Sequence, residues 1–122
     1  MNKKVLIIED HPETAKLISE LLQFEGIETI TASNGHEGIE KANAQKPDLI
    51  LLDVMMPGID GFEVCQKLKT NPETSHIPVI IVSIRAATES QKQGKQAGAD
   101  EYLTKPFEPF KLIEVLKKYL KS

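Results

Sequence analysis

Short aliphatic runs alternate with amphipathic segments along the whole chain. The runs predict five strands, over residues 5–8, 28–32, 49–53, 79–83 and 101–104. The first, third and fourth each contain four consecutive Val, Ile or Leu residues. Such runs are typical of strands buried on both faces, as in a parallel sheet that helices cover on each side.

Amphipathic patterns between and after the strands predict five helices. The first begins at Pro12, a residue suited to the first helical position, and ends before Gly26. The last begins at Pro109 and carries apolar residues at helical spacing. The other three are expected over residues 35–44, 61–69 and 88–96.

This alternation predicts one α/β domain over residues 1–122, with a doubly wound parallel sheet. Right-handed crossovers cover both faces of a sheet only if the chain reverses its winding direction once. Five strands then favour the flavodoxin-like order 2-1-3-4-5, which makes strands 1 and 3 neighbours. Ligands of such sheets bind outside the carboxyl ends of the strands at this reversal point.

Three acidic residues fall where this arrangement puts the ligand. Glu9 and Asp10 end the first strand, and Asp53 ends the third. Carboxylates gathered in one crevice repel one another, and either protonation of one member or a bound cation relieves the repulsion. Mg²⁺ is the expected ion, and it is typically held by one or two carboxylates together with waters and a phosphate. The acids therefore predict a phosphate-bearing partner.

A hydroxyl and an ammonium are expected at the same edge of the sheet. Ser83 closes the fourth strand, and Lys105 follows the fifth. Both groups can donate to phosphoryl oxygens, and an Asp carboxylate can attack phosphorus to form an acyl phosphate. A lone residue of these types usually serves a turn, a helix cap or the solvated surface. Five of them on four strand ends predict phosphoryl chemistry.

Composition excludes several other classes of protein. A net charge of −3 provides no broad basic field for nucleic acid. The single cysteine, Cys65, rules out an internal disulfide and suits a reducing cytosol. No apolar run reaches the roughly 18 residues that span a bilayer, and no signal peptide precedes the first strand, so a soluble cytoplasmic protein is expected. The three histidines, His11, His36 and His76, have no metal-ligand spacing with another His or Cys and are expected to be exposed polar residues.

Four motifs follow one another in order along the chain: residues 7–10 (Ile-Ile-Glu-Asp), 51–61 (Leu-Leu-Asp-Val-Met-Met-Pro-Gly-Ile-Asp-Gly), 82–83 (Val-Ser) and 102–107 (Tyr-Leu-Thr-Lys-Pro-Phe). Within the second motif, Pro57-Gly58 predicts a turn and Asp60 a cap for the third helix. In content and spacing the motifs resemble the receiver domain of two-component response regulators, the family that includes the free-standing chemotaxis regulator. The resemblance covers essentially the whole chain.

The resemblance implies that Asp53 is the phosphoacceptor. It also implies that Glu9, Asp10, Asp53 and the backbone carbonyl of Met55 hold Mg²⁺. The phosphoryl group would come from a histidine kinase or a histidine phosphotransfer protein. The chain would then be a signalling phosphoacceptor that catalyses only its own phosphorylation and dephosphorylation.

The resemblance assigns further roles at the ends of the fourth and fifth strands. Ser83 would be the switch hydroxyl, Lys105 the phosphate partner and Tyr102 a rotating switch aromatic. The bond before Pro106 is implied to be cis. The face formed by the fourth helix, fifth strand and fifth helix would contact a downstream protein.

The same residues argue against three alternative functions. A phosphatase of the haloacid dehalogenase type needs a second acid two residues after the nucleophile, where this chain has Met55, which cannot transfer protons. A flavin or nucleotide module would want a phosphate-binding loop after the first strand, but residues 10–13 (Asp-His-Pro-Glu) are acidic. A receiver that works without phosphorylation is disfavoured because every pocket residue is present.

Two features of the sequence shape expectations about regulation. Ile84 follows Ser83 at a position that is usually small in receivers, so it is expected either to shield Asp53 from water or to pack against the fourth helix. The fourth helix has no large aliphatic residue and contains Gly94. It is therefore expected to be weakly anchored and able to respond to phosphorylation.

Overall fold

The computed structural model describes residues 3–56, 58–84 and 88–120 of the 122-residue chain. In this part, strands and helices alternate as expected. The strands are β1 (Lys4–Ile8), β2 (Glu28–Ala32), β3 (Leu49–Leu52), β4 (Val79–Ser83) and β5 (Glu101–Thr104). The helices are α1 (Pro12–Phe24), α2 (Gly35–Gln45), α3 (Gly61–Thr70), α4 (Thr88–Gln96) and α5 (Pro109–Tyr119).

The boundaries differ from the predicted ones by single residues. β3 ends at Leu52, so Asp53 lies just beyond the strand in which it was predicted. β1 begins at Lys4, and α2 and α3 each extend by one residue. Pro57 lies outside the described residues, whereas Gly58 has the positive φ of +91° that a turn glycine adopts.

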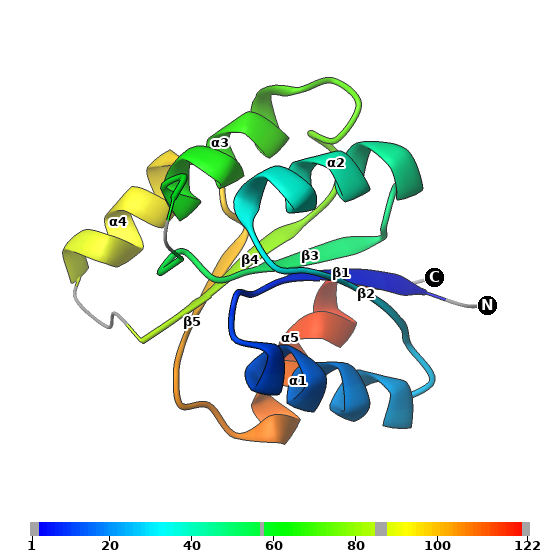
Figure 1. Ribbon diagram of the computed structural model, residues 1–122. Helices are drawn as coiled ribbons and strands as arrows, with labels where there is room; N and C mark the ends of the chain where they lie inside the picture. The colour runs from blue at the N-terminus through cyan, green and yellow to red at the C-terminus, as the bar shows by residue number, and fades with distance from the viewer. Residues whose placement is uncertain (1–2, 57, 85–87, 121–122) are drawn as a thin grey trace.

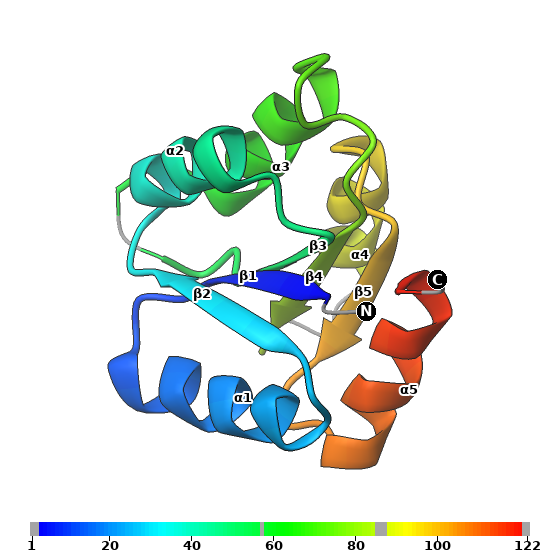
Figure 2. The same cartoon turned by 90° about the vertical axis from the view of Figure 1, so that its right-hand side faces the viewer.

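All strand pairs are parallel, and the sheet order is β2-β1-β3-β4-β5. α1 and α5 cover one face of the sheet, while α2, α3 and α4 cover the other (Figures 1 and 2). The predicted flavodoxin-like fold is confirmed. β1 and β3 are neighbours at the reversal point.

Two hydrophobic cores lie on the two faces of this sheet. Successive side chains of a strand point to opposite faces, so Val5 and Ile7 pack in the core under α1 and α5, while Leu6 and Ile8 pack under α2 and α3. β3 and β4 divide their side chains in the same way. This explains why continuous aliphatic runs, rather than alternating ones, form these strands.

The start of α3 packs directly against the segment that follows β3. A Cβ atom at Gly61 would collide with the Cα of Val54, so only glycine allows this approach. The side chain of Asp60 accepts a hydrogen bond from the Phe62 N–H at 2.9 Å, which confirms it as the helix cap. The residues after Asp53 are thereby held against a helix.

β2 is an edge strand whose outer backbone is partly covered. The ammonium of Lys41 on α2 donates to the Thr31 carbonyl at 2.7 Å and lies 3.1 Å from the Glu37 carboxylate. Across the described ranges, every helix is too short or too polar to cross a membrane.

Candidate functional site

Backbone hydrogen bonds between neighbouring strands continue past the strand ends at the carboxyl edge of the sheet. The N–H of Glu9 donates to the Ala32 carbonyl at 2.9 Å, and that of Asp53 to the Ile8 carbonyl at 3.0 Å. The N–H of Lys105 donates to the Ser83 carbonyl at 2.7 Å. These bonds to neighbouring strands therefore fix the backbone positions of Glu9, Asp53 and Lys105.

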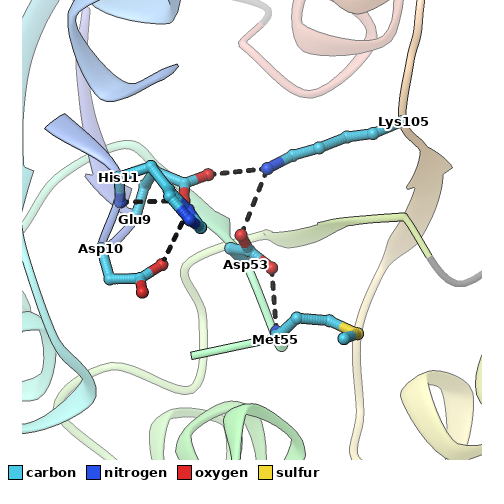
Figure 3. Close-up of polar contacts among 6 residues, drawn as sticks. All are labelled: Glu9, Asp10, His11, Asp53, Met55 and Lys105. Carbon is cyan, nitrogen blue, oxygen red and sulfur yellow. Dashed lines mark hydrogen bonds and ion pairs between the residues drawn. The ribbon is translucent and has the colours of Figure 1, made fainter. Parts of the chain in front are cut away.

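The ammonium of Lys105 bridges two buried carboxylates (Figure 3). Its Nζ lies 2.7 Å from Oε1 of Glu9 and 3.2 Å from Oδ2 of Asp53. Glu9 and Asp53 are only 4% and 5% exposed. Because buried charges are tolerated only when they are paired, Lys105 is the counter-ion that makes this arrangement possible.

Asp53 is oriented through both of its oxygens. Oδ1 accepts a hydrogen bond from the Met55 N–H at 2.8 Å, while Oδ2 faces Lys105 (Figure 3). Two partners from different segments leave the carboxylate little freedom to rotate. The side chain of Met55 is itself partly exposed.

His11, expected only as an exposed polar residue beside the pocket, contacts two carboxylates of the same cluster. As predicted, its side chain is exposed, at 69%. Its Nδ1 nevertheless lies 3.1 Å from Oε2 of Glu9 and 3.2 Å from Oδ1 of Asp10 (Figure 3). Its position directly after the acidic pair was the signal available in the sequence, because carboxylates as well as His or Cys can be its neighbours.

These contacts change the proton affinities of the cluster. Burial, aided by the charge of Asp53, raises the pKa of Glu9 despite the opposing hydrogen bond from Lys105. Burial alone would lower the pKa of Lys105, but its hydrogen bond to Glu9 and the charge of Asp53 outweigh burial and raise that pKa. The hydrogen bond to Glu9 and the charge of Asp10 raise the pKa of His11.

The donor set fits a divalent cation. Glu9, Asp10, His11 and Asp53 each offer one ligand atom, and these atoms lie within 4.8 Å of one another. Oδ1 of Asp10 is buried and makes no hydrogen bond to any of the described residues, although Nδ1 of His11 is 3.2 Å away. A buried carboxylate oxygen in this state is suited to a cation, and the oxygen donors are of the type that Mg²⁺ prefers.

Ser83 and Tyr102 take different places around the cluster. Ser83 is fully buried at the end of β4 and pairs with Thr104 in the sheet register. Tyr102 is half-buried on β5 and packs with the core under α2 and α3. A Cβ atom at Gly94 would lie 3.1 Å from its ring, so the ring sits against α4.

An apolar groove of about 450 Å³ adjoins the cluster and was not predicted. It lies between α1 and the segment from β5 to α5, and Lys105 belongs to both the groove and the acidic cluster. Ile84 lines the groove and is 65% exposed. The peptide bond before Pro106 is cis, as the resemblance implied. The groove residues are Thr14, Leu17, Ile18, Leu21, Ile84, Lys105, Pro106, Phe107 and Pro109.

Comparison with known proteins connects this site to a family. Residues 5–117 match the family described as the response regulator receiver domain. The polar-differentiation response regulator DivK of Brucella anthropi is 39% identical over 120 residues, which are 98% of this chain and 98% of DivK. Some curated relatives are longer: the chain spans 45% of the length of the alkaline phosphatase synthesis regulatory protein PhoP of Bacillus subtilis and 25% of that of the response regulator PleD of Caulobacter vibrioides.

Solved structures agree with this match. The chemotaxis protein CheY4 of Vibrio cholerae is 32% identical, with a TM-score of 0.92 over 98% of this chain and 100% of that one. The receiver domain of the sensor histidine kinase PA1611 from Pseudomonas aeruginosa is 25% identical, with a TM-score of 0.91 over the full length of both chains. That structure has a magnesium ion coordinated in its active-site cleft. The chain described here belongs to the response regulator receiver domain family of two-component systems.

Proposed function

We propose that Asp53 accepts a phosphoryl group from a phosphohistidine, in a Mg²⁺-dependent reaction in the cytoplasm, and that the modification switches protein–protein contacts. The observation that carries the proposal is the state of the Asp53 carboxylate. It is buried at the end of a central strand and is held by the Met55 N–H and by Lys105. A carboxylate so fixed is a nucleophile that needs little reorganisation before attack.

The transfer balances as a simple displacement. An oxygen of Asp53 forms a bond to phosphorus while the P–N bond of the donor's phosphohistidine breaks, and the departing imidazole nitrogen keeps the electron pair and takes a proton. Lys105 is placed to donate to the transferred phosphoryl oxygens. Glu9, Asp10 and Asp53, with the Met55 carbonyl, would hold Mg²⁺. The ion, when bound, neutralises negative charge on the phosphoryl group.

The switch would run from the end of β4 to α4. The Ser83 hydroxyl would donate to a phosphoryl oxygen, and Tyr102 would rotate in response. The ring of Tyr102 lies against Gly94 of α4, so its movement would change the packing of that helix. The face formed by α4, β5 and α5 would then contact the downstream protein.

The phosphodonor would dock in the apolar groove between α1 and the start of α5. We assign the groove to an apolar helix face of the histidine kinase or phosphotransfer protein that bears the phosphohistidine. The groove is continuous with the site, because Lys105 lines the groove and also contacts Asp53. A partner seated there would lie directly beside the phosphoacceptor.

Labelling with acetyl phosphate tests the assignment of Asp53. Wild type should gain one phosphoryl group in Mg²⁺ and none in excess chelator, and Asp53→Asn should gain none. Asp60→Asn is the matched control, since Asp60 is an exposed carboxylate of the same loop. Labelling of Asp53→Asn at the wild-type level would refute the proposal.

A further inference from the structure

We propose that the thioether of Met55 is a reversible oxidation site, and that its sulfoxide speeds the attack of water on the acyl phosphate of Asp53. The proposal rests on the proposed function, because the oxidised side chain would act on phosphorylated Asp53. Three features of Met55 support it: the exposure of the thioether, the hollow that the side chain lines, and the backbone contact with Asp53.

Met55 is accessible to a small oxidant, whereas the methionine beside it in the chain is not. The side chain of Met55 lies in a residue that is 37% exposed, and Met56 is only 8% exposed. Met56 packs in the core under α2 and α3. Because the oxidant must touch the sulfur, a peroxide should modify Met55 before Met56.

The hollow that Met55 lines can accommodate a polar sulfoxide. It has a volume of about 420 Å³ and lies between the segment after β3 and helix α4. Asp60 and Gln93 line it as well, and both are exposed polar residues. An oxygen added to the Met55 sulfur can therefore meet water or the Gln93 amide, whereas an oxygen on Met56 would be forced into the core.

The backbone holds Met55 beside the phosphoacceptor. Its N–H donates to Oδ1 of Asp53 at 2.8 Å. The segment between them is fixed in turn, because Val54 packs against Gly61 at the start of α3. Figure 3 shows the side chain of Met55 extending from this contact with the sulfur near its free end. Methionine turns about three bonds, so the sulfur carries any added oxygen along the edge of the Asp53 site.

Oxidation by a hydroperoxide balances as an oxygen transfer. The sulfur lone pair forms a bond to one peroxide oxygen while the O–O bond breaks. With hydrogen peroxide, the second oxygen keeps the electron pair, takes the proton of the transferred oxygen and leaves as water. The thioether loses two electrons and the peroxide gains them. Methionine sulfoxide reductases return the sulfoxide to the thioether, which makes the modification reversible.

The sulfoxide supplies the polar group that the thioether lacks. A thioether sulfur is a weak hydrogen-bond acceptor, whereas the oxygen of a sulfoxide can hold a water molecule. In hydrolysis, a water oxygen bonds to phosphorus, the bond from phosphorus to the Asp53 oxygen breaks, and the carboxylate keeps the electron pair while a proton passes to solvent. Because a water held in place attacks faster than a free one, oxidation should shorten the half-life of the acyl phosphate about tenfold.

Peptide mapping by mass spectrometry and the half-life of the phosphoprotein, each measured before and after hydrogen peroxide, test the proposal. Wild type should gain an oxygen on Met55 before Met56. After removal of peroxide and labelling with acetyl phosphate in Mg²⁺, its half-life should be about tenfold shorter than that of untreated protein. Treatment with a methionine sulfoxide reductase should restore the longer half-life.

Three variants separate the thioether from other targets of peroxide. Met55→Leu keeps the backbone N–H but has no sulfur, so its half-life should be equal before and after peroxide. Met55→Gln carries an amide oxygen permanently and should have a shorter half-life than Met55→Leu without any peroxide. Met56→Leu is the matched control and should respond to peroxide as wild type does.

Peroxide that leaves Met55 unmodified, or a half-life of oxidised wild type that is unchanged or longer, would overturn the inference and leave the proposed function standing. An equal response to peroxide in wild type and Met55→Leu would do the same, and so would a response that is lost in Met56→Leu. Untreated wild type that takes up no phosphate in Mg²⁺ would overturn the proposed function together with the inference.

Discussion

The ammonium nitrogen of Lys105 lies 2.7 Å from Oε1 of Glu9, although 96 positions separate the two residues in the chain. This contact joins the ends of β1 and β5 across the sheet, while β1 pairs directly with β2 and β3. Burial raises the pKa of Glu9, and the hydrogen bond from Lys105 opposes that rise. The contact with Lys105 therefore stabilises the ionised form of the buried Glu9 side chain.

Replacement of Lys105 should destabilise the protein when no divalent cation is present. Lys105→Met leaves Glu9 and Asp53 without this counter-ion, and losing hydrogen bonds to charged groups costs about 1.5–3 kcal/mol in the free energy of unfolding. Saturating Mg²⁺ should reduce the deficit, because a bound cation can replace the missing ammonium. Urea denaturation with and without Mg²⁺ measures both effects. Lys111→Met, at an exposed lysine of α5, is the control, and an equal loss in the two variants would contradict the prediction.

Ile84 should prolong the life of the acyl phosphate. Its side chain lines the groove that Lys105 also lines, and Met55 offers no polar side chain to orient an attacking water. Since hydrolysis needs a well-positioned water, Ile84→Ala should shorten the half-life of the phosphoprotein about tenfold. Phe110→Ala, another exposed apolar residue, should leave the half-life unchanged. An unchanged or longer half-life in Ile84→Ala would remove Ile84 as the shield.

A charged residue placed in the apolar groove should slow phosphotransfer from a kinase without slowing labelling by acetyl phosphate. Leu17 is an exposed apolar residue of α1 that lines the groove. Leu17→Asp should slow phosphotransfer from a cognate kinase at least about tenfold, because docking would bury a carboxylate without a partner. Labelling by acetyl phosphate, which needs no protein docking, should keep its wild-type rate. Equal slowing with both donors would show that the variant perturbs Asp53 instead.

Hydrogen exchange should be faster in α4 than in α5. The buried residues of α4 are Ser90 and Gly94, which contribute little apolar area. The buried residues of α5 are all aliphatic: Leu112, Ile113, Val115 and Leu116. Local opening follows apolar anchoring, so the amides of α4 should exchange first and respond most to phosphorylation. Equal protection of the two helices would refute this prediction.

Tyr119 should make stability depend on alkaline pH. Its hydroxyl donates to the Glu101 carboxylate at 2.8 Å, and burial together with this bond raises its pKa from 10.0 to about 12. Because the folded state retains the proton, this stabilisation is complete below pH 10 and is lost as pH rises through about 12. At pH 8, Tyr119→Phe should unfold more easily by about 0.5–1.5 kcal/mol.

The deficit of Tyr119→Phe relative to wild type should shrink above pH 11. Chemical denaturation at several pH values measures this difference and cancels the titration of groups that both proteins share. A deficit that stays constant from pH 8 to above pH 11 would show that the stability contributed by the hydroxyl is not coupled to its titration, and would contradict the prediction.

Much of the fold could be predicted because its strongest determinants are local. Runs of four aliphatic residues are typical of strands that are buried on both faces of a sheet, and Pro12 and Pro109 mark the starts of their helices. The strand ends were less predictable. Asp53 continues the backbone ladder through its N–H but lies outside β3, a distinction that depends on pairing rather than on residue type.

The candidate site could likewise be predicted only in part. Glu9, Asp10, Asp53 and Lys105 meet as predicted, since parallel strands bring their carboxyl ends to one edge. The contacts of His11 depend on where its side chain points from the start of α1, and a search for His or Cys partners could not reveal them. The apolar groove is lined by three segments that are far apart in the sequence. The sequence pattern predicts a helix, a strand end and a loop there, but not that the three come together.

The hydrogen bond between Lys41 and the Thr31 carbonyl bears on how copies of this protein can associate. An open strand edge can recruit a strand from another molecule, and sheets that continue from molecule to molecule underlie fibrous aggregates. At β2, recruitment would first have to displace the Lys41 ammonium from Thr31 and from Glu37. The side chain of Lys41 thus covers part of the β2 edge of the sheet, and Lys41→Ala would expose that edge to pairing with a strand of another molecule.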